Sequence, residues 1–586
     1  MPRWRLSRRR FLAGAGGAAA AALAARPRRP AAAQEPAAPG GGPAAPAAPF
    51  ATRPMVMGTH AMVAAGHPLA AEIAVRVLHE GGNVVDAALA GSGVLQVVRP
   101  FASTIGGDLF ALVHDGQTGA VVAINASGPA PRAATIDWFR AQGLRTIPAT
   151  GQLSIEVPGL VGGWALLQER FASWPLADLL APAIAYAADG FPIYPKLTGQ
   201  SAQFAALLAD SPAASALFLP GGQPLRTGEL LVQRDLADSL RAIAVDGAGA
   251  FYGGPLGDAI GRYCQEQGGL LAPADLATAP GELRIPIQTR YRGYTVYELP
   301  PVSQGFVLLE ELNLAAGFDL AGFGPNSADG IHLMVEAKKL AFADRLRYLG
   351  DPAFVPLALD ELLSPTHAEQ RRAAIDPRRA ADTPVAAFDR RARGSDTTYL
   401  CVCDANGNAV SIIQSVNSPW GSGVVVPGTG ILLNDRLQNF WLEAGQPNSL
   451  APGHRTAHTL TSFLVKQGDE LVVIGGTPGA DDQVQTNFQV LVNLLDHGMN
   501  VQEALDATKW SSRPGTLERE QDQPYVLTVE RRLDEGVVAE LVARGHRVQR
   551  VADYTIGAHK TIVRNVENGV LMGGASAARD GYAIGW

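Results

Sequence analysis

Cysteine is scarce in this sequence, which limits how the fold can be held together. Among 586 residues there are three cysteines, Cys264, Cys401 and Cys403, and an odd, sparse set cannot form a disulfide framework. The Cys401-x-Cys403 pair lacks the second pair of ligands that a zinc site needs. The sequence therefore predicts a fold stabilised by neither disulfides nor metal, and nothing in it requires a cofactor.

An excess of positive charge and long apolar runs are missing as well. The 48 Lys and Arg residues are outnumbered by 55 Asp and Glu, for a net charge of −7, so the chain lacks the basic character that nucleic-acid binding requires. No apolar run beyond the N-terminal region is long enough to cross a bilayer. Because 47% of the residues are hydrophobic and 18% charged, we expect a globular protein with a substantial core.

The N-terminal region has the pattern of an export signal. Residues 1–10 carry five Arg and no acid, and an apolar stretch follows over residues 11–25. Ser7-Arg8-Arg9-Arg10-Phe11-Leu12 resembles the twin-arginine signal of proteins exported in the folded state; an ordinary secretory leader is the alternative. We expect a signal peptide over residues 1–33, without a stable membrane anchor, and a flexible Ala/Pro/Gly-rich linker over residues 34–50. The protein is then periplasmic or extracellular.

Beyond the linker, helical and strand patterns alternate, and the part after residue 396 is richer in strands. The expected elements are a helix over 69–78 that stops at Gly81-Gly82-Asn83, a helix over 84–98, a hairpin of 110–114 with 121–125, and a long helix over 328–348.

One later hairpin is defined in enough detail to fix its register. Two β-prone runs, residues 398–403 and 409–416, flank Ala405-Asn406-Gly407, which fits a three-residue loop with Gly407 in the left-handed conformation. Paired residues then have numbers that add up to 812. Thr397 faces Ser415 across the ladder, within hydrogen-bonding reach. By itself this pattern also fits an ordinary Thr/Ser cross-strand pair.

The common catalytic motifs are absent. The chain has no phosphate-binding P-loop, no H-E-x-x-H, no Gly-x-Ser-x-Gly and no dinucleotide fingerprint after a strand. Isolated histidines such as His332, His497 and His546 are better interpreted as helix-surface or packing residues. A threonine nucleophile remains as the hypothesis.

Around Asp396-Thr397-Thr398-Tyr399 the sequence resembles the gamma-glutamyltransferases (glutathione hydrolases), members of the N-terminal nucleophile hydrolases. The resemblance keeps its order and spacing from about residue 54 to the C-terminus. The segments that carry it are Gly81-Gly82-Asn83, Gly106-Gly107-Asp108, Val157-Pro158-Gly159, Pro300-Pro301-x-Ser303-x-Gly305, Gly407-Asn408-Ala409-Val410, Gly430-Ile431-Leu432-Leu433-Asn434, Gly476-Thr477-Pro478-Gly479 and Arg579-Asp580-Gly581.

The resemblance implies an α+β fold, a four-layer αββα sandwich with two antiparallel sheets packed face to face. It also implies self-cleavage of the Asp396–Thr397 bond into a large chain, residues 51–396, and a small chain, residues 397–586, which stay associated. Thr397 then becomes the N-terminal nucleophile, and its freed α-amine acts as the general base. No separate histidine is required.

The resemblance also assigns roles to residues around the nucleophile. Gly479 and Ala480 occupy the positions of the family's oxyanion pair, whose backbone N–H groups stabilise the tetrahedral intermediate. Ser415 stands where the family has a second Thr that hydrogen-bonds the nucleophile. Asn417 matches a family Asn at the substrate end of the same strand.

The glutamyl-recognition positions depart from the family pattern. Ser127 replaces the Arg that clamps the substrate α-carboxylate, so a bidentate contact is lost. Arg436 and Asn439 replace the Gln and Asp that hold the α-ammonium, and His458 and Thr459 replace a pair of serines. A cation beside the ammonium group is repulsive, which argues against free glutathione as the substrate.

These departures suggest a different acyl group. Arg436, His458 and Arg455 can gather around a carboxylate-bearing group without an α-ammonium, unless Arg436 pairs with a nearby acid or points to solvent. The Ala126-Ser127-Gly128 segment resembles oxamate amidohydrolase and cephalosporin acylase-like branches. We therefore expect an amide hydrolase or acyltransferase for a small anionic amide, with water or an amino acid or peptide as acceptor. A true gamma-glutamyltransferase and a non-catalytic binding protein are the alternatives.

Overall fold

The fold is built around two seven-stranded sheets in which every neighbouring pair of strands is antiparallel. The computed structural model describes residues 52–381, 397–520 and 523–586; the expected signal peptide, the linker and Asp396 lie outside them. In spatial order, sheet I contains β21 (Tyr582–Gly585), β2 (Ala61–Ala65), β10 (Thr398–Asp404), β11 (Ala409–Ser415), β3 (Asp108–His114), β4 (Val121–Ala126) and β7 (Glu282–Arg284). Sheet II contains β1 (Val56–Gly58), β20 (Leu571–Ala575), β19 (Lys560–Arg564), β15 (Glu470–Gly476), β14 (Ser462–Gln467), β9 (Tyr294–Glu298) and β8 (Ile287–Tyr291).

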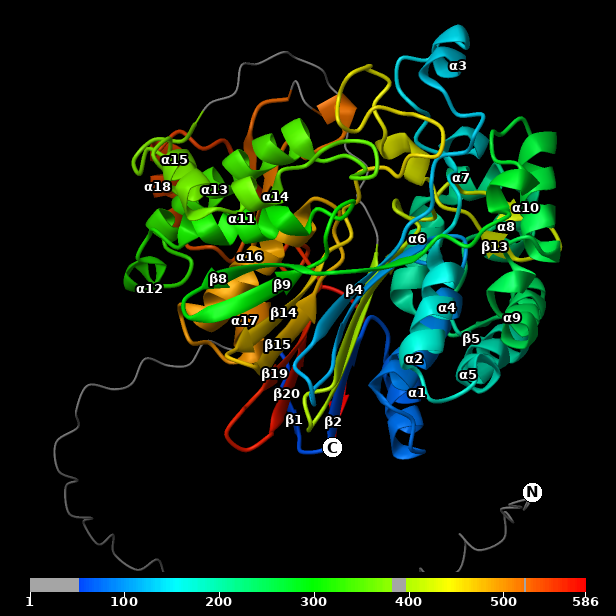
Figure 1. The fold of residues 1–586 in the computed structure, drawn as a ribbon, viewed down its shortest axis with the longest axis horizontal. Helices are drawn as coiled ribbons and strands as arrows, with labels where there is room; N and C mark the ends of the chain where they lie inside the picture. Colours follow the sequence, from blue (N-terminus) through cyan, green and yellow to red (C-terminus); the bar gives the residue numbers. More distant parts are fainter. Residues whose placement is uncertain (1–51, 382–396, 521–522) are drawn as a thin grey trace, which may run out of the picture. The chain divides into compact units, whose positions relative to one another are not determined.

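Helices cover the outer face of each sheet, as Figure 1 shows. The helices outside sheet I include α1 (Pro68–His79), α2 (Val84–Val98), α4 (Leu160–Phe171), α5 (Leu176–Asp189) and α9 (Arg234–Asp246). Those outside sheet II include α11 (Gly305–Ala315), α13 (Ala328–Tyr348), α16 (Asp482–Leu495) and α17 (Val501–Asp506). The αββα sandwich expected from the sequence is confirmed.

Shorter elements complete the layers. The remaining α-helices are α3 (Ile136–Ala141), α6 (Pro195–Gln203), α7 (Ala205–Ala209), α8 (Pro212–Phe218), α10 (Pro255–Glu266), α12 (Leu320–Phe323), α14 (Leu359–Leu362), α15 (Pro365–Arg372) and α18 (Glu535–Ala543). Small sheets join β16 (Trp510–Arg513), β17 (Val526–Glu530) and β18 (Val548–Val551), then β12 (Val425–Val426) with β13 (Ile431–Leu432), and β5 (Phe191–Pro192) with β6 (Leu230–Leu231). Among the described residues, none of the helices is long and apolar enough to cross a membrane.

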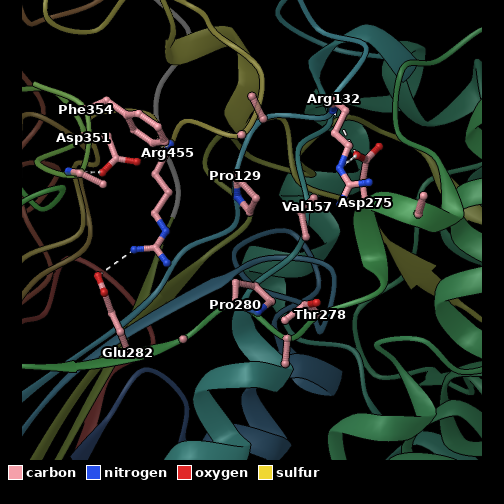
Figure 2. Close-up of a pocket in the computed structure, with 16 residues that line it drawn as sticks. Pro129, Arg132, Val157, Asp275, Thr278, Pro280, Glu282, Asp351, Phe354 and Arg455 are labelled. Atoms are coloured by element: carbon pink, nitrogen blue, oxygen red, sulfur yellow. Dashed lines mark hydrogen bonds and ion pairs between the residues drawn. The ribbon is translucent and has the colours of Figure 1, made fainter.

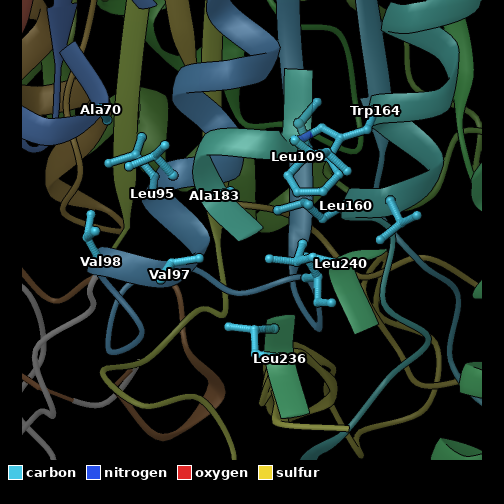
Figure 3. Close-up of a cluster of buried hydrophobic side chains, with 14 of the residues drawn as sticks. Ala70, Leu95, Val97, Val98, Leu109, Leu160, Trp164, Ala183, Leu236 and Leu240 are labelled. Carbon is cyan, nitrogen blue, oxygen red and sulfur yellow. The ribbon is translucent and has the colours of Figure 1, made fainter. Parts of the chain in front are cut away.

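Three apolar layers separate these elements, and strand β10 shows how the sequence builds them. Its side chains alternate: Leu400 and Val402 join the core under the helices of sheet I, which Figure 3 shows in part. Tyr399, Cys401 and Cys403 join the layer between the sheets. Because successive side chains of a strand point to opposite faces of the sheet, one strand contributes to two apolar layers. Burial raises the pKa of the Cys401 thiol to about 12, so this cysteine is a packing residue.

Several local predictions are confirmed residue by residue. Helices α2 and α13 have the expected bounds. Gly81 is in the left-handed region after the first helix, with φ 96°, whereas Asn83 caps the start of α2 by accepting from the backbone N–H of Asp86. The hairpin of β10 with β11 pairs Thr398 with Gln414 and Cys403 with Ala409, which is the predicted register.

Candidate active site

Thr397 immediately precedes β10, and Ser415 ends the neighbouring strand β11. The Thr397 Oγ1 donates a hydrogen bond to the Ser415 Oγ at 3.1 Å, so the predicted hydroxyl pair is confirmed. Gly407, with φ 83°, makes the tight turn that sets this register. Both side chains are buried, and only about 1% of Thr397 is exposed. Asp396, on the other side of the expected cleavage bond, lies outside the described residues.

Ser415 links the threonine to a residue with an unusual backbone. Its Oγ also accepts from the backbone N–H of Asn417 at 2.7 Å. Asn417 has φ 83°, a conformation that side chains other than Gly adopt rarely. Its side-chain Oδ1 accepts from Arg436 Nη1 at 2.8 Å, and its Nδ2 contacts Asn439 Oδ1 at 3.4 Å. Four of the residues singled out in the sequence are thereby joined to Thr397 in one polar chain.

The carboxylate nearest to Arg436 belongs to the protein itself. Asp108 is the cross-strand partner of Ser415 on β3, and its Oδ2 lies 3.6 Å from Arg436 Nε and 3.3 Å from His458 Nε2. Arg436 and His458 therefore do come together as the sequence suggested, but around Asp108. Of the alternatives left open by the sequence, pairing of Arg436 with a nearby acid is the one found.

Glu156 is the second buried acid of this cluster, which contains Asp108, Glu156, Arg436 and His458. Within the described residues, both Glu156 carboxyl oxygens lack a hydrogen-bond partner, as do Arg436 Nε, Arg436 Nη2 and His458 Nδ1. Burial, and then the charge of Asp108, raise the pKa of Glu156 well above its usual range. Burial, followed by the Arg436 charge, lowers the pKa of His458 to about 4. The cluster thus combines the Asp108–Arg436 ion pair with a neutral His458 and with Glu156, whose charged form is disfavoured by burial and by the charge of Asp108.

Sequence reasoning did not identify Asp108 or Glu156 as site residues. Both were visible, since Asp108 ends the Gly106-Gly107-Asp108 segment and Glu156 precedes Val157-Pro158-Gly159. Their convergence depends on β3 pairing with β11 and on Asn434, whose side chain bridges the backbones of Gly106 and Glu156. These contacts span about three hundred residues, which no local pattern predicts.

Three groups of described side chains have the spacing of metal ligands, and each already faces a cation of the protein. The groups are Asp108 with Glu156 and His458, His332 with Glu336 and His546, and Glu310 with Asp344 and His367. Arg436 faces Asp108, Lys339 contacts Glu336 at 2.7 Å, and Arg371 contacts Asp344 at 2.9 Å. These clusters are best described as ion-pair networks.

Gly479 and Ala480 connect β15 to α16 and precede the helix N-cap, Asp481. Their N–H groups stand at the positive end of a 14-residue helix, which favours negative charge. Ala480 has φ 49°, so this turn is held in a left-handed conformation. Gln304 Nε2 donates to the carbonyls of Thr459 at 2.9 Å and of Ala480 at 3.2 Å, which ties this turn to the His458–Thr459 segment.

Tyr399 brings the two sheets close beside this turn. A Cβ added to Gly476, at the end of β15, would lie 2.6 Å from the Tyr399 ring. Only glycine therefore fits there. Tyr399 lies on β10, two residues after Thr397, so this contact holds the start of the Gly476-Thr477-Pro478-Gly479 segment against the strand that follows the threonine.

Two of the remaining predicted residues have other partners. The Ser127 hydroxyl donates to Asn125 Oδ1 at 2.8 Å. Arg455 Nη1 donates to Glu282 Oε1 at 2.7 Å, so Arg455 does not join Arg436 and His458 around one carboxylate.

The sequence matches the family model described as gamma-glutamyltranspeptidase over residues 70–586. The chain belongs to the gamma-glutamyltranspeptidase family. It is 37% identical over 535 residues to the glutathione hydrolase-like YwrD proenzyme of Bacillus subtilis, covering 90% of this chain and 99% of that protein. It is also 37% identical over 539 residues to the acylase ACY 1 proenzyme of Pseudomonas sp. (strain V22), covering 90% of this chain and 94% of that protein.

A solved structure extends the likeness to the whole fold of this gamma-glutamyltranspeptidase family member. The crystal structure of cephalosporin acylase from Bacillus halodurans matches with a TM-score of 0.84 and 36% identity, covering 92% of this chain and 99% of that one. The chain is thus an enzyme with the fold of the N-terminal nucleophile hydrolases.

Proposed function

We propose that this protein is a self-processing amide hydrolase that acts through an acyl-enzyme on Thr397. The observation that carries the proposal is the hydrogen bond from Thr397 Oγ1 to Ser415 Oγ, 3.1 Å long, at the residue where the family resemblance sets the cleavage. Family membership and the position of Gly479 and Ala480 before α16 support it.

Maturation begins with the precursor, for which we propose an export signal over residues 1–33 and a linker over 34–50. Thr397 Oγ1 attacks the carbonyl carbon of Asp396, the Asp396–Thr397 peptide bond breaks, and the resulting ester is hydrolysed by water. The products are the large chain 51–396 and the small chain 397–586. Strands β2, β3, β4 and β7 of the large chain lie in the same sheet as β10 and β11 of the small chain, so the two chains remain one folded unit.

The freed α-amine of Thr397 supplies the base that a hydroxyl nucleophile needs. Its reference pKa of about 7.7 to 8.0 allows it to take the hydroxyl proton near neutral pH. The oxygen attacks the substrate carbonyl, and the N–H groups of Gly479 and Ala480 stabilise the oxyanion. Collapse expels the amine, which receives the proton from the α-amine, and leaves an ester on Thr397. Water, or an amino acid or peptide, then takes the acyl group.

The surroundings of Arg436 favour an acyl group without an α-ammonium. Arg436 is almost completely buried and donates to Asn417, at the position where the family holds the ammonium. A second cation there is repulsive and lacks the water that would screen it. Ser127, engaged with Asn125, offers no guanidinium for an α-carboxylate. We therefore place the substrate among small anionic amides such as oxamate or glutaryl amides, and we place free glutathione outside them.

A substrate panel tests this proposal. The purified mature enzyme is assayed with oxamate, glutaryl-p-nitroanilide and γ-glutamyl-p-nitroanilide, with Thr397→Ala as the blank. We expect kcat/KM for oxamate or the glutaryl compound to exceed that for the γ-glutamyl compound by at least roughly 10-fold, about the cost of one unpaired polar contact. Turnover of the γ-glutamyl compound alone would overturn the substrate assignment. Addition of a dipeptide acceptor separates transfer from hydrolysis.

A further inference from the structure

A cavity lies beside the Asp108 cluster. Its volume is about 470 Å³, and it is lined by segments from five parts of the chain. Figure 2 shows Arg455 and Glu282 on one side and Arg132 and Asp275 on the other, with Pro129, Val157 and Pro280 between them. The cavity therefore has an apolar middle and a guanidinium at each side.

The wall of this cavity and the candidate active site share backbone segments. Val157 follows the buried Glu156, and its backbone N–H donates to the Pro129 carbonyl at 3.2 Å. In the same segment, the backbone N–H of Gly128 donates to Asp108 Oδ1 at 3.2 Å. The backbone that holds the Asp108 cluster on one side thus lines the cavity on the other.

A chain of hydrogen bonds also connects the cavity to Ser127. Ser127 donates to Asn125, whose Nδ2 donates to Glu282 Oε1 at 3.3 Å. The same carboxylate oxygen accepts from Arg455 Nη1 at 2.7 Å. Arg455 is thus held at the cavity by Glu282, which is linked through Asn125 to Ser127, the residue at the position of the family's carboxylate clamp.

Of the three acids that line the cavity, Glu282 accepts from the Arg455 side chain, and the other two accept from backbone N–H groups. Asp275 accepts from the N–H groups of Arg132 at 3.1 Å and Ala272 at 3.0 Å. Asp351 accepts from those of Arg455 at 2.9 Å and Ala353 at 3.0 Å. The carboxylate oxygens of Asp275 and Asp351 are thereby engaged in fixing the loops.

The guanidinium groups, in contrast, keep donors for a ligand. Within the described part of the chain, the Arg132 side chain makes no hydrogen bond and has one ion-pair contact, 3.8 Å from Asp275. Among the described residues, the Arg455 side chain makes one hydrogen bond, through Nη1. Guanidinium donors that remain at a cavity wall match the two oxygens of a carboxylate.

An aromatic surface stands next to Arg455. Phe354 lines the cavity and stacks on His454, with ring centroids 3.8 Å apart and an interplanar angle of 16°. The Phe354 side chain is 55% exposed, so part of the ring is open to a ligand. Aromatic and proline surfaces beside a guanidinium suit an apolar or flat body that ends in an anion.

We infer that this cavity binds a carboxylate-bearing part of the amide substrate, with Arg132 and Arg455 as the specificity-determining residues. The inference rests on the proposed amide hydrolysis and adds where the charge is recognised. The carboxylate has two possible sources, the acyl part of the substrate and the amine that leaves, and the chemistry of recognition is the same for both.

Three matched amides distinguish the sources in steady-state kinetics. N-butyrylaniline is neutral, N-glutarylaniline carries a carboxylate on the acyl part, and N-butyryl-4-aminobenzoate carries it on the amine part. We expect Arg132→Gln and Arg455→Gln each to raise KM for one of the charged compounds by about 5- to 20-fold, the effect of losing a charge-assisted hydrogen bond. KM for N-butyrylaniline should stay within about 2-fold of wild type.

Arg226→Gln is the control variant. Arg226 and Arg132 are similarly exposed, at 72% and 76%, and each faces one acid, at 3.9 Å and 3.8 Å, but Arg226 lies outside the cavity lining. A KM effect limited to N-glutarylaniline assigns the cavity to the acyl part, and one limited to N-butyryl-4-aminobenzoate assigns it to the leaving amine. Unchanged KM values in both cavity variants, or an equal rise with Arg226→Gln, overturn the inference.

Failure of the proposed function would look different. A wild-type enzyme that hydrolyses none of the three amides contradicts the proposed amide hydrolysis of such compounds. Calorimetric titration of the same protein with benzoate and benzamide still tests the cavity: we expect benzoate to bind at least about 5-fold more tightly than benzamide, and Arg132→Gln to remove the difference. Equal binding of the two probes overturns the inference whatever the turnover.

Discussion

Asp108 and Ser415 are cross-strand partners at the ends of β3 and β11. Ser415 accepts a hydrogen bond from Thr397, which immediately precedes the neighbouring strand β10, and Asp108 lies 3.6 Å from Arg436. Directly opposed residues of an antiparallel pair share one face of the sheet. The proposed nucleophile and the Asp108–Arg436 ion pair are therefore positioned by the same three neighbouring strands, β10, β11 and β3.

Thr397→Ala should abolish both maturation and turnover, because one hydroxyl attacks in each reaction. We expect the precursor to stay whole and kcat/KM to fall by at least about 10⁴-fold. Intact-mass spectrometry after incubation measures the first effect and an amide assay the second. Thr397→Ser keeps the hydroxyl and is the control; it should still cleave. A Thr397→Ala protein that matured and hydrolysed amides would falsify the mechanism.

Ser415→Ala should slow both reactions without stopping them. The substitution removes one hydrogen bond to Thr397 and one to the backbone N–H of Asn417. A loss of about 1 kcal/mol of orientation energy corresponds to a roughly 5-fold lower rate. The rate of precursor cleavage and the kcat of the mature enzyme are measured in parallel. Ser415→Thr restores the hydroxyl and should recover most of each, whereas wild-type rates for Ser415→Ala would remove the residue from the mechanism.

Arg436→Met should destabilise the protein, because it leaves Asp108 buried without its cation. Breaking such a pair costs about 3 to 5 kcal/mol. Urea unfolding in the uncleaved Thr397→Ala background keeps the measurement to a single chain. The double variant Arg436→Met with Asp108→Asn should recover part of the loss, since it no longer buries a lone charge. Additive losses in the double variant would show that the two residues do not interact.

Glu311→Gln should stabilise the protein relative to the parent, and the difference in the free energy of unfolding should grow as the pH rises. Glu311 is buried on α11, both its carboxyl oxygens lack a hydrogen-bond partner among the described residues, and burial raises its pKa well above the usual range. A raised folded-state pKa gives stability that is fully present below the unfolded pKa of about 4.3 and is lost as the pH rises through the folded value. The neutral amide avoids this loss.

The measurement is the free energy of unfolding of Glu311→Gln and of the parent between pH 4 and pH 8, again in the Thr397→Ala background. The two free energies of unfolding should coincide near pH 4. Above pH 4 the variant should gain up to about 1.4 kcal/mol over the parent per pH unit, until the folded-state pKa of Glu311 is reached. Glu80→Gln, on an exposed side chain, is the isosteric control. A constant difference across the range would contradict a raised pKa for Glu311.

Much of the local structure could be predicted from the sequence because short-range chemistry determines it. The loop Ala405-Asn406-Gly407 sets the β10–β11 register, since Gly407 adopts the left-handed conformation that such a loop needs. That register alone places Thr397 against Ser415. In the same way, Asn83 caps α2 through a side chain only three residues from its partner.

The residues around Arg436 could not be predicted, because their partners are distant in the chain. Asp108 is 328 residues before Arg436, and their approach depends on the pairing of β3 with β11. The sequence suggested one group of Arg436, His458 and Arg455. In the fold, Arg436 and His458 contact Asp108, whereas Arg455 contacts Glu282. Charge pairing in a core is decided by which backbones the sheets bring together.

The sequence by itself determined the family, the hydroxyl pair and the helices and hairpin that neighbouring residues specify. Turns, caps and alternating side chains act over a few residues and are therefore visible in one dimension. Only the tertiary structure decided that Glu156 is buried beside Asp108 and that Arg132 and Arg455 line a separate cavity. Those outcomes depend on burial and on contacts across three layers, and a side chain's charge and partners follow from that packing.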